Sequence, residues 1–165
     1  MDPCAVPEDA HTLLFGARKL LLVLHTAAAV VLIGSATHHL LQMPARLRGA
    51  PRLRLERIYA LVVAVTYALT YALGALLYPT YRYHVRALFL DRYHPAISNL
   101  FDIKENLATI ALLVALGMGA VGGRLTTEAD DRALVRVYVG MAAFVAAVVW
   151  FNVVSGVVIV SYRSV

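Results

Sequence analysis

Two histidines stand out in the first long apolar segment of this 165-residue chain, His25 and His39. Histidine is rare in membrane-spanning helices because its ring nitrogens need polar partners. At about 100° of turn and about 1.5 Å of rise per residue, their interval places the two imidazoles within about 40° of one helix face and about 21 Å apart. One helix would therefore present one nitrogen ligand near each side of a bilayer.

The face between these histidines offers space for a bulky group. Its residues are mostly small: Ala28, Ala29, Leu32 and Ala36. A flat macrocycle fits such a strip, and neutral imidazole is a favoured axial ligand of haem iron. The neighbouring His38 lies about 100° away from His39 around the helix axis, so the sequence leaves open which of the two faces inward.

The spacing of His25 and His39, with Gly34 between them, resembles the ligand helices of membrane b-type cytochromes, above all the dihaem cytochrome b of quinol-oxidising complexes. The resemblance covers this one helix. It implies haem b as a cofactor, with His25 and His39, or the adjacent His38, as axial ligands. In that family a second helix contributes the same pair of histidines, whereas the other three apolar stretches of this chain contain none.

Three arrangements could supply the missing ligands. A symmetric homodimer that packs its two first helices together would pair each histidine with its own copy, because a twofold interface is self-complementary. A different subunit of a larger membrane complex could supply them instead. Alternatively, His84 or His94 could fold back toward His25, which would leave His39 alone.

The composition is typical of a membrane protein, because 61% of the residues are apolar and only 15% are charged. That leaves too little polar surface to coat a soluble domain of this size. Four stretches lack Asp, Glu, Lys and Arg over at least about 18 residues, the length that a spanning helix needs. We therefore expect an all-α membrane protein, a single domain with four transmembrane helices in an up-down bundle, at about 13–42, 57–79, 100–122 and 132–162.

The connection between the first two helices, residues 45–57, carries five arginines against one glutamate. The positive-inside rule predicts a cytoplasmic location for such a loop, so the N and C termini are both expected on the non-cytoplasmic side. The formal net charge of +5 is then expected to meet anionic membrane lipids rather than nucleic acid. We expect a multi-pass integral membrane protein of a bacterial inner membrane.

A segment at about 80–99, between the second and third helices, alternates aromatic, basic and histidine residues. This pattern favours an amphipathic outer segment on the membrane surface, with tyrosines at head-group depth. A lid or docking surface is the alternative. His84 and His94, near Asp91, could also hold a metal ion, although their spacing matches no compact ligand motif and Pro95 predicts a bend.

A second set of polar residues opens the third helix. Asp102 and Glu105, followed by Asn106 and Thr109, repeat at helical intervals and share one face. A comparable stripe in the second helix ends near them and consists of Tyr67, Thr70, Tyr71, Gly74 and Tyr78. We expect Asp102, Glu105, Tyr71 and Tyr78 to form a quinol or proton-transfer site, because such a site needs a carboxyl that exchanges protons. An interhelical hydrogen-bond network is the alternative.

These patterns predict a small b-type cytochrome or electron-transfer membrane subunit. It would bind haem b, work as a homodimer or in a larger membrane complex, and have a quinone as a candidate partner. One alternative is a non-catalytic accessory or assembly subunit, whose polar stripes bind neighbouring helices. A second alternative is a metal-handling membrane protein.

Overall fold

The computed structural model describes residues 15–125 and 132–162, and the regular structure of these residues is helical. A short 3-10 turn, Phe15–Ala17, leads into four long helices: α1 (Arg18–Leu47), α2 (Leu53–Tyr81), α4 (Pro95–Gly122) and α5 (Arg132–Tyr162). Each is long and apolar enough to cross a membrane. This confirms the expected count of four apolar helices. Residues 13 and 14, placed in the first helix by the sequence pattern, lie outside the described residues.

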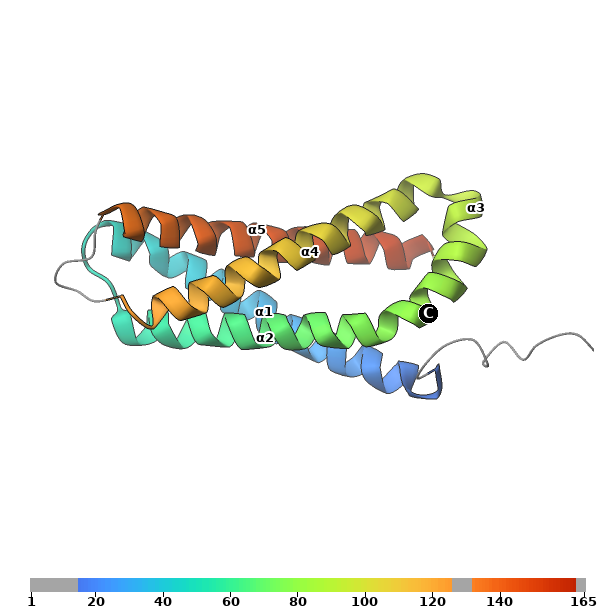
Figure 1. Ribbon diagram of the computed structural model, residues 1–165, viewed down its shortest axis with the longest axis horizontal. Coiled ribbons are helices and arrows are strands. Elements are labelled where there is room, and N and C mark those ends of the chain that lie inside the picture. The colour runs from blue at the N-terminus through green and yellow to red at the C-terminus, as the bar shows by residue number, and fades with distance from the viewer. Residues whose placement is uncertain (1–14, 126–131, 163–165) are drawn as a thin grey trace, which may run out of the picture.

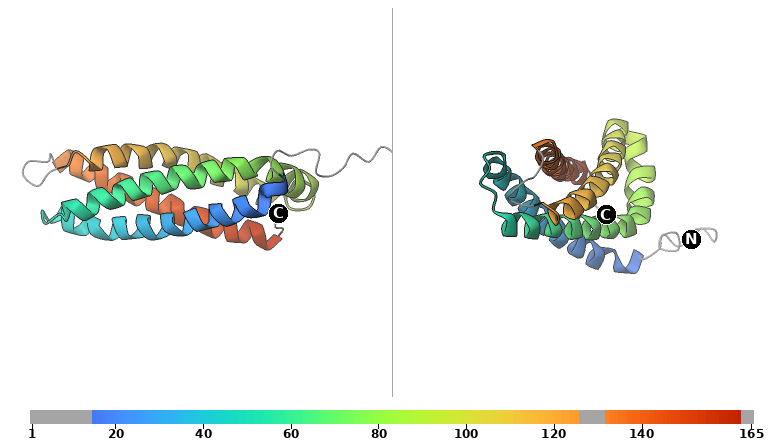
Figure 2. Two further views of the ribbon diagram at one scale, coloured as in Figure 1. Left: turned by 90° about the horizontal axis from the view of Figure 1, so that it is seen from below. Right: turned by 60° about the vertical axis from the view of Figure 1, so that its left-hand side comes forward.

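The four helices form a bundle in up-down order (Figure 1). α1 packs against α2 and α5, and α4 packs against the same two helices. The α1–α2 turn lies at one end of the bundle beside the end of α4 and the start of α5, and we call this the loop end (Figure 2). The opposite end holds the start of α1, the end of α5 and the connection from α2 to α4, and we call it the crossover end.

The connection at the crossover end is itself helical. After α2 the chain enters a π-helical stretch, η3 (Arg82–Leu90), and a single turn, α3 (Asp91–Tyr93), which together run across the end of the bundle (Figure 1). At His94 the backbone leaves the helical region, and Pro95 begins α4. Proline suits the first helical position because its fixed φ is already helical and no amide hydrogen is needed there. α4 therefore starts before position 100, the start expected from the apolar pattern.

Apolar side chains attach this connection to the bundle. Val85 and Leu90 of η3 are buried in a small core with Phe101 of α4 and Ile159 of α5. The main core fills the rest of the bundle and includes Leu32 among its buried residues. The expected amphipathic segment thus covers the end of the bundle with its apolar side.

α2 and α4 approach closely where glycine and alanine meet. A Cβ placed on Gly119 would lie 3.0 Å from Cβ of Ala64, and one on Gly122 would lie 3.0 Å from Cβ of Ala60. The latter would also lie 2.9 Å from the hydroxyl of Tyr138 in α5. Small residues at such positions let helix backbones come together and strengthen van der Waals packing.

We expect Gly122→Ala to lower the stability of the bundle by about 1–3 kcal/mol, the usual cost of adding a methyl group to a filled interior. The added Cβ would overlap the Tyr138 hydroxyl and Ala60. Thermal unfolding of the purified protein in detergent measures the loss. The matched control is Gly140→Ala, because a Cβ at Gly140 of α5 meets no atom within 4 Å. Equal melting temperatures for the two variants would contradict the close approach.

Candidate functional site

His25 lies on α1, half-buried against α2. Its Nδ1 is 2.9 Å from the backbone carbonyl oxygen of Thr70. The ring fits there because Gly74 has no side chain: a Cβ at that position would lie 3.3 Å from Cε1 of His25. A carbonyl oxygen can only accept, so Nδ1 donates and carries the proton. In the neutral ring Nε2 is therefore left as the basic nitrogen.

His39 occupies a different environment on the same helix. Its side chain is only 1% exposed, and its Nε2 lies 3.1 Å from the hydroxyl of Tyr138 in α5. The two rings meet edge to face, with 5.6 Å between their centroids. Within the described part of the chain, Nδ1 of His39 has no hydrogen-bond partner. His39 thus faces the bundle interior and is packed against α5 rather than α2.

The adjacent His38 points out of the bundle core. It is exposed, its Nδ1 donates to the carbonyl oxygen of Gly34 at 2.9 Å, and its ring stacks on Tyr59 of α2 at 5.8 Å. Of the two neighbouring histidines, His39 is therefore the inward one.

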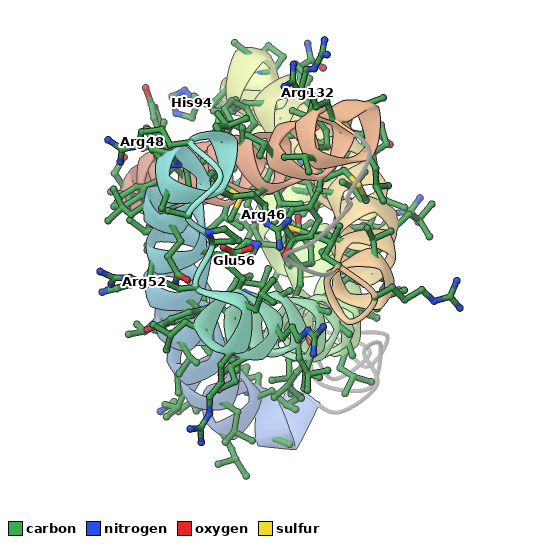
Figure 3. The ribbon with its side chains drawn as sticks, turned by 90° about the vertical axis from the view of Figure 1, so that its left-hand side faces the viewer. Arg46, Arg48, Arg52, Glu56, His94 and Arg132 are labelled. Carbon is green, nitrogen blue, oxygen red and sulfur yellow. The ribbon has the colours of Figure 1, made fainter. Side chains whose placement is uncertain are left out.

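A buried ion pair at the loop end was not foreseen from the sequence. Nε of Arg46, in the last turn of α1, lies 2.5 Å from Oε2 of Glu56, in the first turn of α2, and the side chains are 3% and 2% exposed. Figure 3 shows these two side chains pointing toward each other between the helices. The other carboxylate oxygen, Oε1, accepts the backbone N–H of Arg52 at 3.1 Å.

This ion pair adjoins the histidine and tyrosine just described. Cζ of Arg46 lies 5.8 Å from the centroid of the Tyr138 ring, within the range of a cation–π contact. His39, Tyr138, Arg46 and Glu56 thus form one buried group, which we call the loop-end polar cluster. It connects α1, α2 and α5 inside an otherwise apolar core.

The sequence did carry a weak signal for this cluster. Glu56 is the single acidic residue among the arginines at 45–57. An up-down hairpin with a short turn brings the last turn of one helix beside the first turn of the next. The sequence pattern predicts a loop over the whole stretch, whereas α1 continues to Leu47 and α2 begins at Leu53.

At the crossover end, Arg86 of η3 binds Asp102 of α4 through two parallel contacts. Nη1 lies 2.5 Å from Oδ1 and Nη2 lies 2.9 Å from Oδ2. Nε of Arg86 is also 3.5 Å from Oδ1 of Asp91, and that oxygen accepts the hydroxyl of Ser98 at 2.5 Å. Such two-point pairing fixes the relative orientation of the two side chains in addition to the attraction between their charges. Asp102 is therefore engaged in holding the crossover to the bundle.

The other residues expected at the quinol or proton-transfer site, Tyr71, Tyr78 and Glu105, do not contact one another in a single group. The hydroxyl of Tyr71 lies 2.9 Å from Oγ1 of Thr109, which joins α2 to α4. Tyr78 stacks on Phe101, with ring centroids 6.1 Å apart. Glu105 is half-buried, and none of the ion pairs among the described residues involves it. The two helices thus bring the expected residues to one end of the bundle, as a set of interhelical contacts.

The histidines of the crossover pack against aromatic rings. His94 contacts Tyr162 at 4.8 Å and Phe89 at 5.4 Å between ring centroids, and His84 meets Tyr83 edge to face at 5.0 Å. The described residues bring together no group of three or more His, Cys, Asp or Glu side chains that could hold a metal ion.

Comparison of the chain with protein-family models, curated proteins and solved structures finds no match. Its function must therefore be inferred from the chemistry of these residues.

We expect Glu56→Gln to reduce the free energy of unfolding by about 3–5 kcal/mol, because it removes the carboxylate charge that faces the buried Arg46 guanidinium. Unfolding in detergent, followed by circular dichroism, gives this value. Replacing both partners, as in Arg46→Met with Glu56→Leu, should recover most of the loss.

Asp102→Asn is the comparison variant, because the Asp102 side chain is 43% exposed in its ion pair. Partly exposed pairs contribute about 1 kcal/mol or less. We therefore expect breaking the buried pair to cost more stability than breaking the exposed one. Equal losses of unfolding free energy for Asp102→Asn and Glu56→Gln would contradict this.

Proposed function

We propose that the chain is an integral membrane subunit whose four helices cross a bacterial inner membrane, with the loop end on the cytoplasmic side and both termini outside. The four apolar helices support insertion. The exposed arginines of the loop end, among them Arg48, Arg52 and Arg54, support the orientation, because positive residues gather on the cytoplasmic side.

We further propose that this subunit carries electrons by means of a b-type haem bound at His25. The observation that carries the proposal is the hydrogen bond from Nδ1 of His25 to the carbonyl of Thr70. Histidines that bind metals commonly donate the other ring N–H to a carbonyl or carboxylate, which fixes the tautomer and makes the ligating nitrogen more basic. In His25 the Nδ1–H makes this hydrogen bond, so Nε2 is the nitrogen that would bind iron.

His39 does not fit a haem in this arrangement. Its Nε2 is in a hydrogen bond with Tyr138, and its side chain is almost fully enclosed by the bundle. An iron ligated there would have to displace Tyr138 from the core. We therefore assign the cofactor to His25 alone, not to the pair of histidines.

If the haem is held by two histidines, the second one would come from another chain. His38 is stacked on Tyr59, and His84 and His94 pack on rings of the crossover. A second copy of this chain is the simplest source, because a twofold interface would bring the second copy's His25 to the same site.

The haem would supply reversible one-electron transfer. The chain's own residues would hold it and manage protons nearby. The Thr70 carbonyl orients the imidazole, and Gly74 leaves space for it. Of the two carboxyls on α4, Asp102 is held by Arg86, so Glu105 is the one available to accept a proton from a quinol at this end.

The decisive measurement is the visible spectrum of the detergent-purified protein before and after reduction with dithionite, with haem quantitation. We expect the reduced α-band of a bis-histidine haem b, at one haem for each pair of chains. His25→Ala should abolish the band, because it removes the ligand.

His38→Ala is the matched control and should keep the band, because this exposed imidazole lies outside the core. His39→Leu should also keep it. A colourless protein purified with its native partners, or retention of haem by His25→Ala, would overturn the proposal.

A second candidate is a non-catalytic accessory subunit of a larger membrane complex. It is favoured by the internal pairing of Arg46 with Glu56 and of Arg86 with Asp102, because these charged groups then hold the helices together and are not used for catalysis. This candidate predicts a colourless protein that co-purifies with other membrane subunits, so the same spectrum distinguishes the two.

A further inference from the structure

A pocket of about 230 Å³ opens at the loop end, between the end of α1 and the start of α2. Its walls are formed by Leu41, Gln42, Ala45, Arg48 and Arg52. In Figure 3 the side chains of Arg48 and Arg52 lie on the outer side of α1, whereas Arg46 points inward to Glu56. The pocket is therefore separate from the loop-end polar cluster, although the two share the same turn.

The two arginines of this pocket bring positive charge to it. Glu56 is occupied by Arg46 and by the backbone N–H of Arg52. Nε of Arg48 donates to the carbonyl of Pro44 at 3.1 Å, which leaves its terminal amino groups available. Within the described residues no ion pair joins Arg48 or Arg52 to an acidic side chain. Guanidinium groups are suited to phosphate oxygens, which they bind in pairs of parallel hydrogen bonds.

A third polar group of the pocket, the side-chain amide oxygen of Gln42, lacks a hydrogen-bond donor within the described residues. Nε2 of Gln42 donates to the carbonyl of His38 at 3.4 Å, but Oε1 is buried and has no hydrogen-bond partner within the described part of the chain. Buried amide oxygens are usually satisfied. A ligand with a hydroxyl group beside its negative charge would meet this requirement.

The remaining walls are apolar and face outward. Leu41 is 70% exposed on the surface of α1, and Ala45 lies one turn further along. In a helix that crosses a bilayer, this part of α1 would lie where acyl chains give way to head groups. The pocket thus combines two guanidinium groups, one acceptor and an apolar side.

We propose that this pocket binds the phosphodiester of an anionic phospholipid whose head group carries a hydroxyl, of the phosphatidylglycerol type. Arg48 and Arg52 bind the phosphate oxygens, Oε1 of Gln42 accepts the head-group hydroxyl, and Leu41 and Ala45 contact the start of an acyl chain. The inference rests on the proposed membrane location and is independent of the haem.

The test uses the full-length protein, delipidated in detergent and titrated with short-chain phosphatidylglycerol, with short-chain phosphatidylcholine and with inorganic phosphate. Native mass spectrometry counts the bound lipid. Phosphatidylglycerol should bind, and the double variant Arg48→Gln, Arg52→Gln should bind it roughly thirtyfold more weakly, from about 1 kcal/mol for each basic residue near a lipid surface.

The matched control removes the same charge from the same end. Arg54 of α2 and Arg132 of α5 are exposed and lie outside the pocket, so Arg54→Gln, Arg132→Gln should leave the affinity nearly unchanged. Equal weakening by the two double variants would show a diffuse attraction and overturn the site. Inorganic phosphate that binds as tightly as the lipid would overturn the assignment to a phospholipid.

Gln42→Leu tests the head-group contact. It should weaken binding of phosphatidylglycerol but not of phosphatidylmethanol, whose head group has no hydroxyl. Equal effects on both lipids would overturn the role of Gln42.

Cell fractionation and carbonate extraction examine membrane insertion separately. A protein that stays in the membrane but binds no phosphatidylglycerol would overturn the pocket alone. A protein that is extracted would overturn the membrane location on which the inference rests.

Discussion

The ion pair between Arg46 and Glu56 can form only if α1 ends and α2 begins at neighbouring points of the bundle. Desolvating two charges costs several kcal/mol for each ion unless the geometry is close and the remaining polar atoms are satisfied. The turn between the helices brings the two charges together, because Gly49 adopts a φ of +77°, which L side chains rarely adopt, and the second carboxylate oxygen of Glu56 receives the backbone N–H of Arg52. An alignment shifted by one helical turn would leave both charges buried and apart.

That alignment extends along the whole α1–α2 interface. His38 stacks on Tyr59 further from the turn, and His25 reaches Thr70 near the crossover end, as one antiparallel register requires. Apolar contacts alone specify register weakly in a membrane, because lipid tails are as apolar as leucine side chains. The hydrogen bond between His25 and Thr70 therefore belongs to the same helix register as the charge pair at the opposite end of the interface.

Charge-free stretches were sufficient to predict an all-helical chain with four apolar helices, because apolar length alone decides whether a helix is long enough to cross a bilayer. They were insufficient for the partners of each side chain. The helical interval placed His25 and His39 near one face, but α1 lies between two neighbours, and the first ring meets α2 while the second meets α5. The sequence could not single out Arg46 either, because the density of arginines at 45–57 predicts a loop and does not show that one of them turns inward to Glu56.

Polar side chains that pair within the chain differ in role from those that we propose bind ligands. Arg86, Asp102, Tyr71 and Tyr138 are engaged within the chain, so their positions describe how the helices are held together. Among the described residues, no ion pair joins Arg48 or Arg52 to a carboxylate, and the hydrogen bond from His25 to Thr70 is made by Nδ1 and not by Nε2. These are the groups that we propose bind a lipid and a cofactor. We propose a haem at Nε2 of His25 and a phosphodiester at the guanidinium groups of Arg48 and Arg52, and these two proposed sites lie at opposite ends of α1 and share no residue. Each proposal can therefore be tested without the other.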